Sequence, residues 1–352
     1  MRKLIFKIHL SIALTIGTFL VLLGTTGSII AFEPELDRLL HPHLSYASPG
    51  SEALSLGQIS DAVSRRFVGE PIVAFLLPSS PDFSAQVVLP SGIVYVNQYT
   101  GEILGVRTRG QTFLGFARAL HVRLATGDVG KDILKWSAVA MLFSLASGLY
   151  LWWPLKRVRI RGGWRHMRFW FDLHHALGIF SLFPLLVLAV TGTIIGFEDQ
   201  ATRLINKLSG SAMLTIPQTG ARTEPTRGAI PITPDEAVAI ARAEMPGTIP
   251  YRVQMPRFGG LYRVSLHSSQ DKLMGDRNSV AVDPHSGTVI SSVRSGDSSI
   301  AQRILAANEA IHTGNVFATP SRILVCLTSI TLPLQAFSGL LMWLRRNKIL
   351  LD

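Results

Sequence analysis

Four histidines fall into two pairs when the chain is compared with itself. At a shift of 165 positions His9 meets His174, and at a shift of 191 positions His121 meets His312. Similarity at a fixed offset is the mark of a duplicated unit, so each copy supplies two of the four imidazoles. The same shifts align three further pairs of segments: Thr26-Gly27 with Thr191-Gly192, Ser147-Gly148-Leu149 with Ser338-Gly339-Leu340, and Trp152 with Trp343.

Two neutral imidazoles that face each other in an apolar cavity are the axial ligands that a b-type haem needs. The pairing predicts two such haems, an inner one between His9 and His174 and an outer one between His121 and His312. Zinc fits less well, because it usually takes three or four ligands and no carboxylate or cysteine lies at metal spacing beside either pair. Several residues lie near the right places to help a flat macrocycle approach: Phe6, Phe113, Phe116, Trp170, Phe171 and Gly178.

Each histidine also has an ordinary structural interpretation, as an interfacial anchor or a hydrogen-bonded cap. His175 adjoins His174 and is the alternative ligand, but the repeat selects His174, and we expect His175 to be packed or hydrogen-bonded. A single cysteine, Cys326, and the lack of a C-x-x-C-H segment exclude cysteine-ligated clusters and covalently attached haem. The remaining histidines have no aligned partner and are expected in surface or loop roles: His41, His43, His166, His267 and His285.

Four apolar segments are long enough to place these histidines in a bilayer. The chain has 352 residues, of which 47% are apolar and 16% charged, and this balance indicates a polytopic membrane protein. The first segment resembles a cleaved signal peptide, but it matches an internal helix, so we expect it to be retained. The four segments are 10–32, 136–153, 177–197 and 323–344.

The net charge of +11 is concentrated beside these segments, which argues against nucleic acid as the partner. Only two acidic residues, Asp172 and Asp352, accompany the basic residues there. The positive-inside rule therefore places the N-terminus, the loop 154–170 and the C-terminus in the cytoplasm, and the two long connections outside. Twelve basic residues carry this signal: Arg2, Lys3, Lys7, Lys156, Arg157, Arg159, Arg161, Arg165, Arg168, Arg345, Arg346 and Lys348.

This topology pairs the histidines by depth. The first and third membrane segments both run outward, so His9 and His174 share the inner level. The second and fourth both start outside, so His121 and His312 share the outer level. Two parallel copies standing side by side would bring each pair face to face.

The outer connections each predict one helix packed on a small antiparallel sheet. A helix over "LSLGQISDAVSRRF" precedes strand-like segments and a hairpin turn at Thr100-Gly101, and "ITPDEAVAIARAEMPG" repeats this order. Thr233 and Glu236 form a capping-box pattern. Residues 208–230 are rich in Gly, Ser, Thr and Pro and predict a linker. An apolar stripe predicts an amphipathic helix at the outer face: Phe113, Phe116, Leu120 and Leu124.

The sequence resembles the PepSY-associated transmembrane-helix family of bacterial inner-membrane proteins over nearly its whole length. The segments that carry the resemblance are "KIHLSIALTIG", "FEPELDRLL", "LHVRLATGDVG", "FDLHHALGIF", "VAVDPHSGTV", "IHTGNVF" and "SGLLMWLRR". Similar members include iron-regulated membrane proteins and dihaem reductases of ferric siderophores. The resemblance implies haem ligation by His9 with His174 and by His121 with His312. Asn97-Gln98 departs from the pattern, standing where the second copy has Asp283-Pro284.

The expected fold is an α+β membrane protein with four transmembrane helices in two tandem parallel repeats, each with a small extracytoplasmic PepSY-like α+β domain. The predicted boundaries are 1–32 for the first transmembrane helix, 33–111 for the first outer domain, 112–153 for the outer amphipathic helix and second transmembrane helix, 154–170 for the basic loop, 171–197 for the third transmembrane helix, 198–303 for the linker and second outer domain, 304–344 for the outer segment and fourth transmembrane helix, and 345–352 for the tail.

The resulting functional hypothesis is an inner-membrane electron-transfer protein. Electrons from a quinol or a cytoplasmic reductant would pass through the two haems to an oxidised acceptor outside, a ferric siderophore or other chelated iron. The alternative is a non-enzymatic membrane-anchored PepSY module that binds or regulates extracytoplasmic proteases. A siderophore-iron permease subunit is a third hypothesis, which the lack of an evident polar pathway disfavours.

Overall fold

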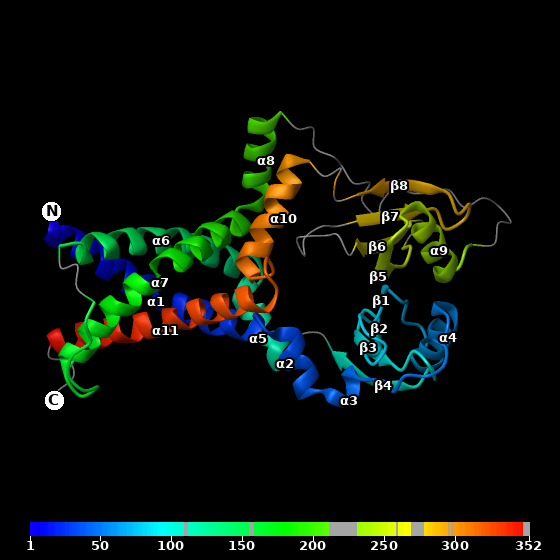
Figure 1. The fold of residues 1–352 in the computed structure, drawn as a ribbon, viewed down its shortest axis with the longest axis horizontal. Coiled ribbons are helices and arrows are strands. Elements are labelled where there is room, and N and C mark those ends of the chain that lie inside the picture. The colour runs from blue at the N-terminus through cyan, green and yellow to red at the C-terminus, as the bar shows by residue number, and fades with distance from the viewer. Residues whose placement is uncertain are drawn as a thin grey trace. The chain divides into compact units, whose positions relative to one another are not determined.

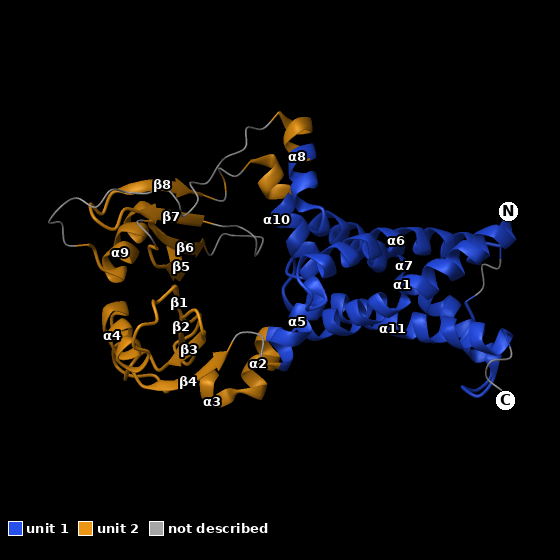
Figure 2. Cartoon of the chain, turned by 180° about the vertical axis from the view of Figure 1, so that it is seen from behind, with its two compact units in different colours: residues 1–33, 113–204, 305–352 blue, residues 34–112, 205–304 orange. Residues whose placement is uncertain are grey.

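A computed structural model describes the chain except for residues 109–111, 155–157, 211–230, 258–259, 269–277, 295, 297–298 and 348–352. Most of the predicted linker 208–230 therefore lies outside the described residues. The chain forms two compact units (Figure 2), one of residues 1–33, 113–204 and 305–352 and the other of residues 34–112 and 205–304. Each unit is built from segments that are far apart in the sequence.

The first unit contains four helices long and apolar enough to cross a membrane: α1 (Arg2–Ile30), α6 (Asp128–Trp152), α7 (Met167–Gly196) and α11 (Thr319–Arg346). They run alongside one another in a bundle (Figure 1). Each packs against two neighbours, in the order α1, α6, α7, α11 and back to α1, so α1 and α7 occupy opposite corners. The four predicted membrane segments are confirmed as helices, and each helix starts before its apolar run.

Small side chains line the contact between α1 and α11. Gly24 is buried, and a Cβ at this position would lie 2.5 Å from the Ser329 carbonyl oxygen and 2.8 Å from the Leu332 Cβ. Small residues at such contacts let helix backbones approach, which is the main source of helix association in a bilayer. A Cβ at Gly17 on the same helix would meet no atom within 4 Å, so Gly17 is not part of the contact.

Short helices flank the long ones. Helices α5 (Phe113–Arg123) and α10 (Ile300–Thr313) come before α6 and α11, and α2 (Glu33–Leu40) and α8 (Glu198–Ser209) come after α1 and α7. Gly127 and Gly314 supply the turns into α6 and α11 with φ values of 72° and 75°, which glycine adopts readily.

Helix α5 is confirmed, and the apolar stripe lies outside its buried face. Leu114 and Ala117 are the buried residues of the helix, whereas Phe113 and Phe116 are 65% and 52% exposed. Exposed aromatic residues agree with the prediction of an amphipathic helix at a membrane face. Periodicity alone cannot distinguish a core-facing stripe from one that faces a bilayer, because both are apolar.

The second unit contains a single eight-stranded antiparallel sheet in the order β4-β3-β2-β1-β5-β6-β7-β8. We expected two small outer domains, and the structure joins their strands through the pairing of β1 with β5. The strands are β1 (Ala74–Leu76), β2 (Ala85–Val88), β3 (Gly92–Val96), β4 (Ile103–Thr108), β5 (Thr248–Gln254), β6 (Tyr262–Ser268), β7 (Asn278–Val282) and β8 (Val289–Val293).

One hydrophobic core serves the whole sheet. Helices α4 (Leu56–Arg66) and α9 (Pro234–Glu244) contribute Val63 and Ala241 to a cluster that includes Val94 and Val264 of the sheet. Both helices begin with a capping box, Ser55 with Gln58 and Thr233 with Glu236. The predicted box at Thr233 is therefore confirmed, as is the turn at Thr100-Gly101. A further short helix, α3 (Pro42–Ser45), packs near β3 and β4.

An acidic residue connects the two helices. The Asp235 carboxylate accepts hydrogen bonds from the backbone N–H groups of Leu56 at 2.8 Å and Gly57 at 2.9 Å. It thus satisfies two donors at the start of α4, where helices leave their N–H groups unpaired and favour negative charge. Gly57 occupies the matching position on α4, and a Cβ there would lie in ordinary contact with this carboxylate, at 3.6 Å.

Replacing Gly24 should destabilise the bundle. Gly24→Ala must displace the Ser329 backbone or separate α1 from α11, at a cost of about 1–3 kcal/mol, while Gly17→Ala adds a methyl group in open space. Thermal unfolding of the detergent-solubilised protein should show a lower midpoint for Gly24→Ala than for Gly17→Ala. Equal midpoints for the two variants would contradict this packing.

Removing the Asp235 carboxylate, which caps α4, should destabilise the second unit. Asp235→Ala leaves two N–H groups of α4 without their carboxylate and should cost about 1–2 kcal/mol of unfolding free energy. Asp61→Ala is the matched control, because it removes an exposed acid from α4 itself. Denaturant unfolding followed by circular dichroism tests this, and the proposed cap is wrong if both variants lose the same stability.

Candidate functional site

All four aligned histidines make the same kind of hydrogen bond through Nδ1. Each bond joins the ring to a serine or threonine hydroxyl on a different helix. The inner pair uses serines and the outer pair uses threonines. The distances are 2.9 Å from His9 to Ser147, 3.0 Å from His174 to Ser338, 3.0 Å from His121 to Thr26, and 2.8 Å from His312 to Thr191.

The hydroxyl protons in these bonds point elsewhere. Thr26 Oγ1 lies 2.6 Å from the Leu22 carbonyl oxygen, and Thr191 Oγ1 lies 2.7 Å from that of Val187. Two oxygens this close need a proton between them, and only the hydroxyl has one to give. The serines make the same bond to helix carbonyls, Ser147 to Ser144 at 3.0 Å and Ser338 to Leu334 at 2.8 Å.

The protonation of each ring follows from this arrangement. Because the hydroxyl proton is donated to a carbonyl, the hydroxyl oxygen must accept from the imidazole, so Nδ1 carries the ring proton. A neutral imidazole with a proton on Nδ1 has a free electron pair on Nε2. Among the described residues, none of the four Nε2 atoms makes a hydrogen bond. The structure therefore presents four Nε2 electron pairs suited to a metal.

A glycine lies beside each ring, next in sequence to the hydroxyl residue. A Cβ at Gly27 would lie 3.0 Å from His121 Cε1, and one at Gly192 would lie 3.1 Å from His312 Cε1. A Cβ at Gly148 would lie 3.4 Å from His9 Cε1, and one at Gly339 the same distance from His174 Cε1. Each imidazole thus lies against a hydroxyl-glycine pair. The hydroxyl fixes its hydrogen bond, and at the two outer rings the glycine leaves space that a Cβ would crowd.

The aligned rings also lie near one another across the bundle. His121 is close enough to His312 for a charge on one ring to affect the other, and His174 is similarly close to His9. Helices α5 and α10 are not among the four long apolar helices. His121 lies on α5 and His312 on α10. Burial, and to a lesser extent the charge of His312, lowers the pKa of His121 to about 4, and burial lowers the pKa of His312 to about 4. Both rings are therefore neutral at pH 7.

The inner and outer sites lie at different levels of the bundle. On α1 the inner histidine, His9, precedes the outer hydroxyl, Thr26, by 17 positions, and on α7 the same spacing separates His174 from Thr191. At 1.5 Å per residue this corresponds to about 25 Å along each helix. The two levels are thus closer than opposite faces of a hydrocarbon layer roughly 30 Å thick.

The other histidines have local partners or lie away from the pairs. His175 Nδ1 bonds the Phe171 carbonyl oxygen at 2.7 Å, as expected for the residue that the repeat does not select. His41 lies 3.3 Å from Asp37, and the ring centroid of His267 is 5.8 Å from that of Tyr251. Among the described residues, no group of three or more His, Cys, Asp or Glu side chains gathers to hold a metal ion.

The structure shows where the residues expected beside a macrocycle lie, and the aromatic ones are partly or largely exposed. A Cβ at Gly178 would lie 3.3 Å from Nε2 of Gln335, so this glycine faces a side-chain amide. Exposed fractions are 39% for Phe6, 38% for Phe171, 65% for Phe113 and 52% for Phe116. The residues that sequence reasoning missed are the four hydroxyls and their glycines, although the internal alignment contains every one of them.

Buried charge lies beside the inner pair. Asp172 is 6% exposed and sits two positions before His174 on α7. Its carboxylate pairs with Arg161 at 3.2 Å and with Arg168 at 3.1 Å. Arg161 comes from the basic loop and Arg168 from the first turn of α7. Together they fix the start of this helix, because an unpaired carboxylate would be costly to bury.

A family comparison agrees with this architecture. The PepSY-associated TM region model matches residues 6–346, nearly the whole chain. The chain belongs to the PepSY-associated transmembrane family. It is a multi-pass membrane protein whose long apolar helices contact a lipid bilayer. No curated protein matches the chain significantly.

The ring protonation can be measured directly. In protein prepared without bound metal and labelled with ¹⁵N-histidine, NMR should show protonated Nδ1 and unprotonated Nε2 at His312. Thr191→Val removes the acceptor and should give a mixture of both tautomers. Thr193→Val is the matched control, because Thr193 makes the same helix bond, 2.7 Å to Ala189, without a histidine. A proton on Nε2 of His312 in the unaltered protein would contradict the assignment.

Proposed function

We propose that this protein is a dihaem b-type electron carrier of the bacterial inner membrane. His9 and His174 would hold an inner haem, and His121 and His312 an outer one. The observation that carries the proposal is the shared arrangement of the four imidazoles, each with Nδ1 bonded to a hydroxyl and Nε2 free. One axial ligand from each of two helices is the donor set of a bis-histidine haem.

The surrounding residues fit this role. A histidine that ligates a metal almost always donates its other ring N–H to a polar group, which fixes the ring and raises its basicity as a ligand. Ser147, Ser338, Thr26 and Thr191 are such acceptors. Pairs of imidazoles also suit haem better than zinc, because the porphyrin supplies the other four ligands, whereas zinc takes most of its ligands from side chains.

The haems would supply one-electron redox chemistry, and the chain positions and tunes them. The two histidine pairs, about 25 Å apart along the helices, would hold the haems at successive levels of one electron-transfer route. A quinol or a cytoplasmic reductant is the proposed donor, with the N- and C-termini in the cytoplasm as the basic flanking segments favour.

A ferric siderophore or similar iron chelate outside the membrane is the proposed acceptor, so the protein would act as a ferric-siderophore reductase. One electron would reduce Fe(III) to Fe(II). Chelators that prefer ferric iron then release the metal. Family membership and the extracytoplasmic placement of the sheet unit, inferred from the charge distribution, support electron transfer to an acceptor outside the membrane.

A visible spectrum tests the haem assignment. The purified protein should show the sharp dithionite-reduced bands of bis-imidazole haem, and any one of His9→Ala, His174→Ala, His121→Ala and His312→Ala should remove about half of the signal. His175→Ala is the matched control and should keep it all. A protein purified with haem available that shows no bands would contradict the proposal and favour the non-enzymatic PepSY module. Loss of half the signal in His175→Ala would contradict the choice of His174.

A further inference from the structure

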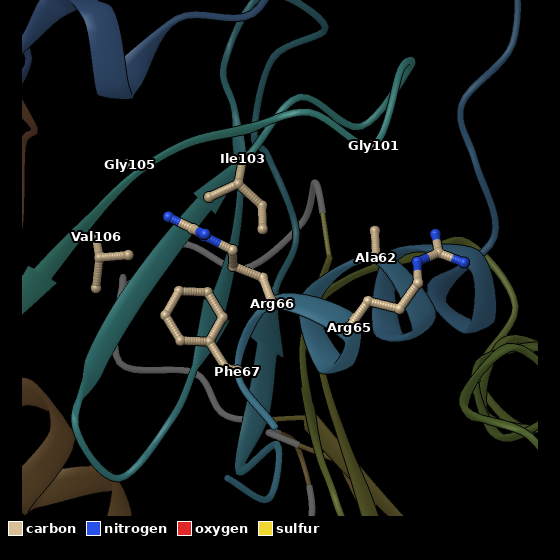
Figure 3. A pocket seen from close by; sticks show the side chains of 8 residues that line it. All are labelled: Ala62, Arg65, Arg66, Phe67, Gly101, Ile103, Gly105 and Val106. Atoms are coloured by element: carbon tan, nitrogen blue, oxygen red, sulfur yellow. The ribbon is translucent and has the colours of Figure 1, made fainter. Parts of the chain in front are cut away.

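A pocket of about 480 Å³ lies within the sheet unit, between the end of α4 and the edge strand β4 (Figure 3). Helix α4 ends before it covers the strand. Ile103 and Val106 project from β4 on the side that faces α4, because they pair with the core residues Val96 and Val94. Val106 is 44% exposed, which is unusual for an apolar residue above a core. The volume is in the range of small-molecule sites.

Two arginines give this pocket its charge. Figure 3 shows Arg66 reaching from the end of α4 toward Ile103, near the ring of Phe67, while Arg65 runs back along the helix past Ala62. Neither guanidinium forms an ion pair with a described residue. The pocket thus combines apolar side chains, one aromatic ring and two arginines, with Arg66 beside the apolar residues and Arg65 on the part of the wall near Ala62.

Basic residues at a helix C-terminus have an ordinary explanation, because they favour the negative end of the helix dipole. The second half of the sheet unit has one basic residue in the same turn, Arg242, but none at the positions that match Arg65 and Arg66. Helix α9 matches α4 at a shift of 178, with a capping box at the same place in each. Arg65 and Arg66 correspond there to Ala243 and Glu244.

The strand side of the pocket differs in the same way. Strand β8 matches β4 at a shift of 186, with Gly101 and Gly287 both at positive φ in the preceding turns. The exposed Val106 corresponds to Ser292. In the second half an arginine instead bonds the helix end directly, Arg294 to the Glu244 carbonyl oxygen at 2.9 Å. The two adjacent arginines at the helix end and the exposed Val106 are therefore particular to the first half.

We propose that this pocket binds a small aromatic anion, such as a hydroxylated benzoate. Arg65 and Arg66 would bind its acidic groups by charge-assisted hydrogen bonds. Phe67, Ile103 and Val106 would cover its ring, and an arginine plane can also stack on an aromatic face. The proposal does not depend on the haems, because every residue it uses lies in residues 34–112.

Titration calorimetry on the full-length protein in detergent tests the proposal, with 2,3-dihydroxybenzoate as the probe. Benzyl alcohol has the ring without the charge, and inorganic phosphate has the charge without the ring. We expect each of these two to bind at least about tenfold more weakly than the probe, a difference of about 1.4 kcal/mol. Binding of phosphate or benzyl alcohol as tight as that of the probe would overturn the proposal.

Three variants test whether the probe binds in this pocket. Arg65→Ala and Arg66→Glu introduce the residues that α9 has at the matching positions, so both are compatible with this helix end. Each should weaken binding of the probe at least about tenfold. Arg242→Ala, which removes an exposed charge from the last turn of α9, is the matched control and should change nothing. No binding by the unaltered protein, or equal binding by all three variants, would overturn the proposal. A visible spectrum on the same samples reports the haems separately.

Discussion

The hydrogen bond between each paired histidine and a helix hydroxyl is the interaction on which the candidate sites depend. A serine or threonine inside an apolar helix has one proton, and the nearest acceptor is a carbonyl of the preceding turn. Once that proton is committed, the oxygen can only accept. An imidazole that packs against it must present an N–H, and its second nitrogen is left with a free electron pair. A bond between two neutral groups thus decides which atom of the ring can meet a metal.

The glycine that follows each hydroxyl explains why the ring can reach it. Adjacent helix positions differ by about 100° around the axis, so the hydroxyl and the glycine present neighbouring parts of one helix face. A larger residue at Gly27 or Gly192 would put a methyl group about as close to the ring carbon as contact permits. In a bilayer, where water cannot compensate a lost hydrogen bond, such close seating keeps the imidazole bonded.

The sequence allowed a good prediction of the elements, because each carries a local signal. Long apolar runs, the capping box at Thr233 and the turn at Gly101 depend on neighbouring residues alone. The union of β1 with β5 could not be predicted in this way, since it depends on two edges whose strands lie far apart in the chain. The contact that buries Leu114 and Ala117 of α5 could not be predicted either, because periodicity does not distinguish an apolar stripe facing lipid from one facing protein. Thr26-Gly27 and Ser147-Gly148 were visible as aligned segments, but alignment within a chain does not say which helix each one contacts.

The two halves of the repeat differ at contacts that one side chain can make alone. Asp235 on α9 caps the start of α4, and its counterpart on α4 is Gly57. A single carboxylate therefore makes the contact between the two helix starts. Asn308 donates to the Thr191 carbonyl at 3.1 Å from α10, and its counterpart on α5 is Ala117. By contrast, the histidine, the hydroxyl and the glycine recur at all four places. A feature that only stabilised helix packing could have diverged in one half as these contacts did. Ligands of the proposed haems would have to act in pairs and could not diverge in this way, because the loss of one imidazole would leave the other without a function.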